Sequence, residues 1–129
     1  MIIFDTDICI DLLHGNRNVL IRREQTDESI AVSFMTVAEL FYGAEKSDYP
    51  VKNHSSVEQF LISVEVIQSD NQILKRFGQL KAQLENEGLP IADADALIAA
   101  TTLEKGTRLI TGNTKHFERI SQLRIENWR

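Results

Sequence analysis

The sequence predicts an α/β protein, with a mainly parallel sheet of four to five strands between two layers of helices. Short apolar runs rich in β-branched residues alternate with longer segments that carry apolar residues at helical spacing. The short runs have the length of buried strands, and the longer segments have the pattern of helices that cover a sheet. Strands and helices that alternate in this way favour a parallel sheet covered on both faces, which is a three-layer α/β/α sandwich.

Two strands are expected in the first half of the chain. Met1–Phe4 is an apolar run that stops at the polar corner Asp5-Thr6-Asp7, as a buried strand does. Ser29–Phe34 alternates in polarity and is predicted to be the second strand. The helices predicted here cover 8–13, 17–26 and 36–46, and another helix, carrying Val57, Phe60 and Leu61, is expected after a loop that contains Pro50 and Asn53.

The second half of the chain continues the alternation. Val64–Ile67 is predicted to be the third strand, and Asp70 is expected to cap a helix that Gly88 ends. This helix carries apolar residues on one face, namely Ile73, Phe77, Leu80 and Leu84. After Pro90, we expect an alanine-rich, largely buried helix over 93–104, a strand over 107–110, a short helix over 114–120 and an edge strand over 123–126.

Composition indicates one globular domain over residues 1–129. The chain is 43% hydrophobic and 26% charged, and we expect neither a membrane span nor a secretion signal. The single cysteine, Cys9, cannot form an internal disulfide, which fits a cytoplasmic protein. The formal net charge is −5, whereas a protein that binds RNA by charge alone is usually basic. RNA binding therefore requires locally clustered basic residues, or a metal ion that neutralises carboxylates.

Polar side chains that can bind a metal ion are expected to converge at one edge of the sheet. Asp5 directly follows the first strand, Glu39 lies one turn into the helix after the second, and Asn113 comes shortly after the fourth. Asp93 and Asp95 open the alanine-rich helix. In parallel α/β sheets the carboxyl ends of the strands form the functional edge. Carboxylates gathered there without Lys or Arg repel one another, which favours a divalent cation such as Mg²⁺ among them.

Each of these residues also has a structural interpretation. Thr36 and Glu39 have the spacing of a capping box at a helix start. Asp7 fits the N-cap of the helix over 8–13, and we favour this role over metal binding. Asn113 is typical of turn chemistry.

Asp93 and Asp95 cannot both face inward from a regular helix, because residues two apart differ in direction by about 200°. Asp95 shares its face with Ile98 and Ala99 and is the better candidate for an inward-facing ligand. Asp93 is expected to be the cap, and it reaches a metal ion more readily if it precedes the regular helix.

Several segments of the sequence together resemble the motifs of one known protein family. The opening strand and turn of that family are similar to residues 2–13 (IIFDTDICIDLL), and its second acidic motif is similar to residues 36–43 (TVAELFYG). The third motif resembles residues 90–100 (PIADADALIAA). The usual ending resembles residues 109–119 (LITGNTKHFER) and 123–128 (LRIENW), so the resemblance covers nearly the whole chain in order. The family that the chain resembles is the VapC-type toxins, which are PIN-domain ribonucleases.

The resemblance implies a PIN-like α/β/α fold and a metal-dependent endoribonuclease that cleaves RNA, with tRNA as the expected target. It implies Mg²⁺ or Mn²⁺ as cofactor and water, activated by the metal, as the attacking group. It also implies a homodimer, an inhibitory cognate antitoxin, and a heterotetramer or larger assembly with that antitoxin.

Carried over motif by motif, the resemblance assigns catalysis to Asp5, Glu39 and Asp95. Asp5 and Asp95 would bind the metal, Glu39 would bind it directly or through water, and Asp93 is a further candidate. The fourth family position, often an acid, is Asn113 here, which brings no charge. Thr6 and Thr111 lie beside the acids as possible hydrogen-bond donors to metal-bound water or phosphate; a purely structural role as strand-end threonines fits them equally.

Two other classes of function are considered. A haloacid-dehalogenase-like phosphatase would use Asp5 as nucleophile and Asp7 as general acid, but it needs an acidic pair after the fourth strand, where Thr-Gly-Asn stands. A catalytically degenerate binding module would have lost its metal site through Asn113, but unpaired buried carboxylates without a function are costly.

Basic residues near the acidic edge are candidates for contact with RNA phosphates. They are Lys115 and Arg119 after the fourth strand, and Arg22 and Arg23 on the second helix. For any one of them, a solvated helix face is the competing interpretation. The segment Leu40-Phe-Tyr42 is a candidate for the core, and we hypothesise that part of it lines a groove for the partner.

Overall fold

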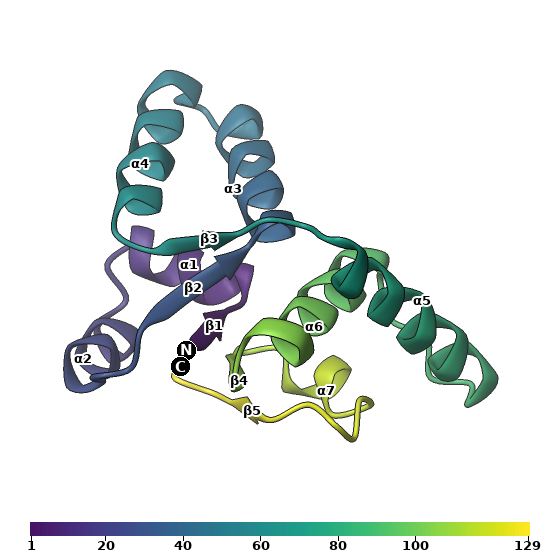
Figure 1. Ribbon diagram of the computed structural model, residues 1–129. Coiled ribbons are helices and arrows are strands. Elements are labelled where there is room, and N and C mark those ends of the chain that lie inside the picture. Colours follow the sequence, from purple (N-terminus) through teal and green to yellow (C-terminus); the bar gives the residue numbers. More distant parts are fainter.

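Five parallel strands form the central sheet of the protein, for which a computed structural model describes residues 1–129. The strands are β1 (Ile2–Phe4), β2 (Ile30–Ser33), β3 (Glu65–Ile67), β4 (Arg108–Ile110) and β5 (Ile125–Glu126). Their order across the sheet is β3-β2-β1-β4-β5, and every neighbouring pair is parallel. The most buried strand, β1, therefore lies at the centre (Figure 1).

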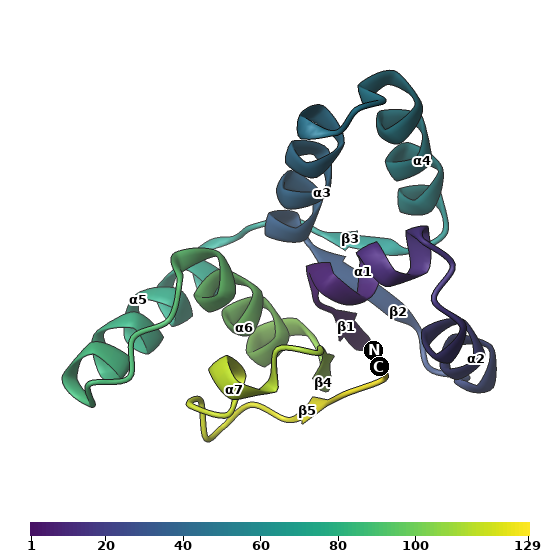
Figure 2. The same cartoon turned by 180° about the vertical axis from the view of Figure 1, so that it is seen from behind.

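Seven helices cover the two faces of this sheet (Figures 1 and 2). They are α1 (Thr6–Leu13), α2 (Arg17–Gln25), α3 (Phe34–Lys46), α4 (Pro50–Ile62), α5 (Asn71–Asn86), α6 (Asp93–Lys105) and α7 (Thr114–Phe117). Side chains of α1 to α4 share one hydrophobic core with Ile2 and Phe4, whereas those of α5 to α7 share another with Ile3. Successive side chains of β1 thus pack into opposite cores, as strand geometry requires. The predicted three-layer sandwich is confirmed.

Several predicted element starts are wrong, two of them because polar side chains cap the helices earlier than the hydrophobic pattern indicates. The first helix begins at Thr6, with Asp5 as its N-cap, so Asp7 is not the cap but lies in the first turn. The third helix begins at Phe34, where Ser33 accepts a hydrogen bond from the backbone N–H of Thr36. Pro50 is not in a loop but occupies the first turn of α4, where its missing N–H costs nothing.

The chain reverses its direction of travel across the sheet between β1 and β4. From β1 it moves outward to β2 and β3, then returns to place β4 on the other side of β1. The segments that follow β1 and β4 consequently diverge at the carboxyl edge of the sheet, and such a switch point is where α/β folds bind ligands. No helix is both long enough and apolar enough to cross a bilayer.

Helix α6 lies close against both the sheet and α5. Its alanines Ala96, Ala99 and Ala100 are almost fully buried, and only small side chains allow this approach. Because Asp95 is in the first turn of α6, the packing of these alanines sets the position of its carboxylate relative to the sheet.

A larger side chain on the buried face of α6 should therefore destabilise the protein. We expect Ala99→Leu to lower the free energy of unfolding by about 1–3 kcal/mol, because the core has no room for the added carbons. Urea denaturation would measure this. The matched control is Ala82→Leu on the exposed face of α5, which should change stability by less than about 0.5 kcal/mol. Equal effects of the two substitutions would contradict the tight packing of α6.

Candidate active site at the carboxyl ends of β1 and β4

Asp5 lies at the centre of the carboxyl edge and is only 5% exposed. Its backbone N–H donates to the carbonyl of Ile110 on β4. One carboxylate oxygen accepts from the backbone N–H of Thr6 at 2.8 Å, and the other accepts from the Thr111 hydroxyl at 2.7 Å. The side chain is thus fixed by its neighbours along the chain and by the adjacent strand.

The electrostatic surroundings of Asp5 disfavour its charged form. Burial, followed by the negative charge of Asp7, raises the pKa of Asp5 from 3.8 to about 7. The hydrogen bonds from Thr111 and Thr6 oppose this rise in pKa, and Asp95 adds a smaller repulsion. A carboxylate in this state gains stability from any cation that approaches it.

Glu39 reaches the same edge from the second turn of α3. The Thr6 hydroxyl lies 2.7 Å from Glu39 Oε1 and 3.0 Å from the hydroxyl of Thr36. The capping-box interpretation of Glu39 is wrong, because the helix begins at Phe34 with Ser33 as its N-cap. The hydrogen bond between Thr6 and Glu39 links the start of α1 to α3 beside the carboxylate of Asp5.

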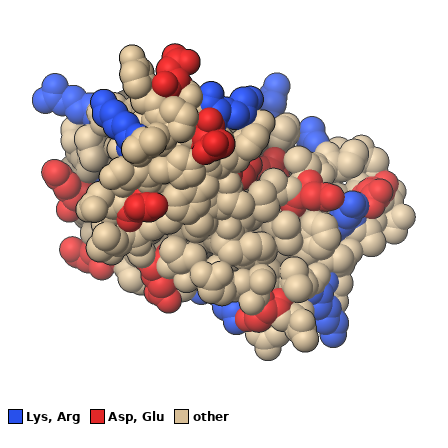
Figure 3. Space-filling model, turned by 90° about the horizontal axis from the view of Figure 1, so that it is seen from above, with Lys and Arg blue, Asp and Glu red and all other residues tan.

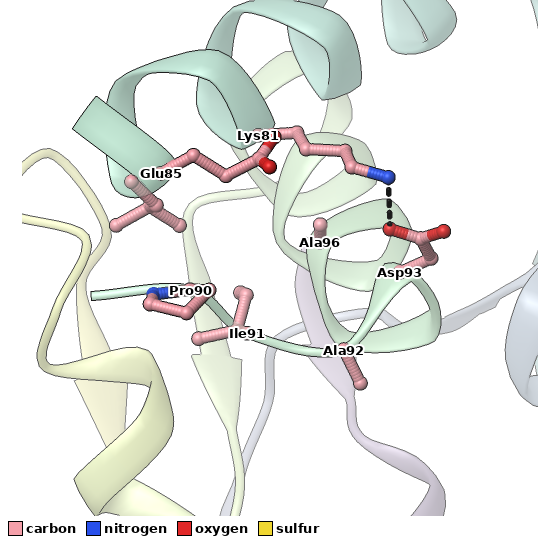
Figure 4. Close-up of a pocket in the computed structure, with 8 residues that line it drawn as sticks. Lys81, Glu85, Pro90, Ile91, Ala92, Asp93 and Ala96 are labelled. Carbon is pink, nitrogen blue, oxygen red and sulfur yellow. Dashed lines mark ion pairs between the residues drawn. The ribbon is translucent and has the colours of Figure 1, made fainter. Parts of the chain in front are cut away.

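The two acids at the start of α6 point in different directions, as the helical geometry predicts. Asp93 is 62% exposed and forms an ion pair with Lys81 of α5 at 3.0 Å, on the side of the helix that faces α5 (Figure 4). Asp95 is 20% exposed, and its charge acts on Asp5. The structure thus brings Asp95 to the site and directs Asp93 toward α5. The prediction that Asp93 is the cap is wrong, because Ala92 is the N-cap residue of α6 and Asp93 is already helical.

The loop after β4 contributes both backbone and side-chain groups to the site. Thr111 is fully buried, and its hydroxyl oxygen accepts the backbone N–H of Asn113 at 2.9 Å while donating to Asp5. The Asn113 amide lies 2.9 Å from Nδ1 of His116, which in turn is 3.5 Å from Asp95. Asn113 therefore sits at the edge of the carboxylate cluster without adding charge to it.

Two residues of this region were missed in the sequence analysis. Asp7, which was interpreted as a cap, accepts the backbone N–H of Gly112 at 2.9 Å, and its Oδ1 is buried with no hydrogen-bond partner. Burial raises the pKa of Asp7, while the Gly112 N–H and the Arg129 guanidinium oppose the rise. The pairing of Arg129 with Asp7 and Asp11 has no signal in the sequence, because the residues lie more than a hundred positions apart.

Most basic candidates for RNA contact are engaged within the protein. Arg22 pairs with Glu126 and stacks over Trp128, and Arg23 donates to Ser63. Arg119 donates to the carbonyl of Pro90, whereas Lys115 is exposed and forms no ion pair. The surface in Figure 3 intersperses acidic and basic side chains and shows no continuous basic stripe. The structure thus favours Lys115 over the two helix α2 arginines as an RNA contact.

The side chains at the site suit a hard divalent cation by their chemistry. Carboxylate and hydroxyl oxygens surround Asp5, and the unpartnered buried oxygen of Asp7 adds another acceptor. No three His, Cys, Asp or Glu side chains are placed so that they could hold a metal ion by themselves. The site therefore fits an ion held by one or two carboxylates and several waters, as Mg²⁺ usually is.

Cys9 is buried and free, and burial raises the pKa of its thiol well above the ordinary value. It is therefore a core residue without nucleophilic character.

The family model of the PIN domain matches residues 2–123 of this chain. Over 96% of the chain, the sequence is 38% identical to ribonuclease VapC2 of Haemophilus influenzae, of which 95% is covered. With the same coverage it is 34% identical to the tRNA(fMet)-specific endonuclease VapC of Shigella flexneri. The chain therefore belongs to the VapC family of PIN-domain proteins.

Solved structures give the same relationship. A chain of the DNA-bound VapBC complex of Salmonella typhimurium superposes with a TM-score of 0.93 at 34% identity, covering 99% of this chain and 98% of that one. A chain of the VapBC2 complex of Rickettsia felis, bound to a DNA fragment from its promoter, superposes with a TM-score of 0.93 at 33% identity, and both chains are covered completely.

The raised pKa of Asp5 predicts a specific pH dependence of stability in metal-free protein. Because the folded protein holds this proton more tightly than the unfolded chain, Asp5 contributes stability that is full below about pH 4 and is lost as pH rises through about 7. Asp5→Asn removes this loss. The stability advantage of Asp5→Asn over wild type should grow by about 2 kcal/mol between pH 5 and pH 7.5.

Urea denaturation in EDTA would measure this difference at both pH values. The matched control is Asp27→Asn, since Asp27 is exposed and makes neither a side-chain hydrogen bond nor an ion pair. A pH-independent gap between wild type and Asp5→Asn would contradict the electrostatic description of the site.

Proposed function

We propose that this chain is the ribonuclease toxin of a toxin–antitoxin pair and that it cleaves RNA at the carboxyl edge of its sheet. The observation that carries the proposal is the buried Asp5 carboxylate, with Glu39 and Asp95 directed to the same edge, at the switch point of the sheet. Its curated relatives are named ribonucleases or endonucleases, and solved relatives are VapBC complexes.

In the proposed reaction, Asp5 and Asp95 would hold a divalent ion, Mg²⁺ or Mn²⁺. When bound, the ion supplies positive charge that offsets the carboxylates and the scissile phosphate. Thr111 fixes the orientation of Asp5, and Thr6 fixes that of Glu39. Asn113 places a neutral amide at the fourth position, so the charge at this site comes from three acids and the neighbouring Asp7.

A tRNA is the proposed substrate class, because relatives at 34% and 36% identity are named tRNA(fMet)-specific endonucleases. The mixed surface charge fits a nuclease whose grip on phosphate depends on a metal ion and a few local cations such as Lys115. End-mapping of RNA fragments produced by the purified chain would identify the cleaved molecule.

The phosphatase alternative is not favoured. No acidic pair follows β4, and the loop there consists of Thr111, Gly112 and Asn113. The binding-module alternative leaves unexplained why Asp5 is held in a buried position that raises its pKa.

The division of roles between the two α6 acids is testable. Asp5→Asn and Asp95→Asn should each reduce RNA cleavage at least about 100-fold, because each removes a proposed metal ligand. Asp93→Asn should retain cleavage within about threefold, because Asp93 pairs with Lys81 instead. A labelled tRNA pool and a denaturing gel would measure the rates.

The same assay tests the metal. EDTA should abolish cleavage and added Mg²⁺ or Mn²⁺ should restore it. Full cleavage by Asp95→Asn, or loss of cleavage in Asp93→Asn alone, would reverse the assignment of the two acids.

This protein offers a suitable docking surface for the antitoxin beside the site. A groove of about 370 Å³ lies between α1, α3 and α4, and Leu13, Leu40 and Val57 are among its lining residues. Glu39 also lines it, so a segment bound in this groove reaches the active site. Leu40 itself belongs to the core and Tyr42 is 64% exposed, so the hypothesised partner segment Leu40-Phe-Tyr42 is divided between core and surface. The homodimer, and a heterotetramer or larger complex, remain part of this proposal.

Filling the groove should block the antitoxin. A Cβ at Gly43, which lines the groove, meets no atom within 4 Å, so Gly43→Phe should fold and project its ring into the groove. We expect at least about tenfold weaker binding of the cognate antitoxin, measured by calorimetry on metal-free protein. Gly78→Phe on α5, where a Cβ also meets open space, is the matched control. Unchanged binding by Gly43→Phe would place the antitoxin elsewhere.

A further inference from the structure

The side chain of Arg129 packs against Gly112 in the loop that follows β4. Its Nε donates to Asp11 Oδ2 at 2.6 Å and its second terminal nitrogen to Asp11 Oδ1 at 3.3 Å. The remaining nitrogen is 3.8 Å from Asp7 Oδ2. A Cβ placed on Gly112 would lie 2.7 Å from Arg129 Cδ, so the arginine packs directly on the backbone of Gly112.

Asp7 and Asp11 need such a cation. They stand one turn apart on α1, where like charges destabilise a helix, and both are largely buried. A planar guanidinium can bridge two carboxylates with fixed geometry, which the single ammonium of lysine cannot do. Arg129 hydrogen-bonds Asp11 and, as a longer ion pair, offsets the charge of Asp7, whose Oδ2 accepts the Gly112 N–H.

The loop after β4 that contacts Arg129 and Asp7 also contacts Asp5, the proposed metal ligand. Gly112 donates its backbone N–H to Asp7 and packs against Arg129. The preceding residue, Thr111, donates its hydroxyl hydrogen to Asp5. Asn113 is fixed to the same hydroxyl through its backbone N–H. The loop is therefore held at two places, at Gly112 by Asp7 and Arg129 and at Thr111 by Asp5.

We propose that Arg129 is a positioning residue: by clamping Asp7 and Gly112, it holds Thr111 against Asp5 and so sets the orientation of the carboxylate. Its consequence for catalysis rests on the proposed ribonuclease function, whereas the clamp itself does not.

Arg129 is not needed to attach the end of the sequence to the fold. Trp128 is 3% exposed and packs edge-on against Phe4, with ring centroids 5.2 Å apart. Glu126 is bound by Arg22 and Arg108. Substitution of Arg129 should accordingly leave the sheet and β5 in place.

The first test measures the clamp without any substrate. In Arg129→Ala, amide hydrogen exchange at Gly112, followed by NMR on metal-free protein, should become about tenfold faster, because the acceptor Asp7 is released. Arg124→Ala is the matched control, since the Arg124 side chain is exposed and makes no hydrogen bond or ion pair. Unchanged Gly112 exchange in Arg129→Ala would overturn the proposal.

The second test follows RNA cleavage in a double-mutant cycle. A Cβ at Gly112 would displace Arg129, and Gly112 has no positive φ that forbids alanine, so Gly112→Ala should mimic Arg129→Ala. Each single variant should lower kcat about tenfold with little change in KM, and the double variant should be no slower than either. Arg129→Lys should recover only part of the rate.

Additive losses in the double variant would show that the two residues act separately and would overturn the proposal. A rise in KM alone, fully rescued by Arg129→Lys, would instead make Arg129 an RNA phosphate contact and would equally overturn it. Absence of cleavage by wild type would count against the proposed function, and the exchange measurement would still decide the clamp.

Discussion

The buried carboxylate of Asp5 is the constraint around which the carboxyl edge is arranged. Its backbone joins β1 to β4, its side chain caps α1, and its second oxygen holds the loop that leaves β4. Burial and the neighbouring acids make its charge unfavourable, and the Thr111 hydroxyl and the Thr6 backbone N–H offset part of this cost. A residue used only for stability would be better served by an uncharged isostere, and the electrostatic cost therefore points to function.

The sequence was sufficient for the sheet, the layers and the acids that follow the strands, because hydrophobic periodicity reports directly which side of an element is buried. Asp93 and Asp95 could be ranked on helical geometry alone, and the structure directs them to different neighbours. The starts of α1 and α3 were misplaced because Asp5 and Ser33 combine a strand end with a helix cap, and the hydrophobic pattern records only the strand.

Other parts of the site could not be predicted, because they depend on contacts between distant parts of the chain. The pairing of Arg129 with Asp11, and the use of Arg22 to hold Glu126, follow from where the last strand returns to the sheet. The number of charged residues did not reveal these ion pairs either. The net charge of −5 conceals that several arginines near the carboxylates are occupied by internal ion pairs.

The contact between Asp5 and Thr111 joins residues 106 positions apart, and this has a consequence for how the protein is made. During translation Asp5 and Glu39 emerge before α5 and α6, and the loop that orients Asp5 emerges only after β4. Long-range strand pairing forms late because loop closure must precede it. A nascent chain on the ribosome therefore carries Asp5 and Glu39 without their assembled surroundings, and the proposed site is completed only after Thr111 has been synthesised and has reached Asp5.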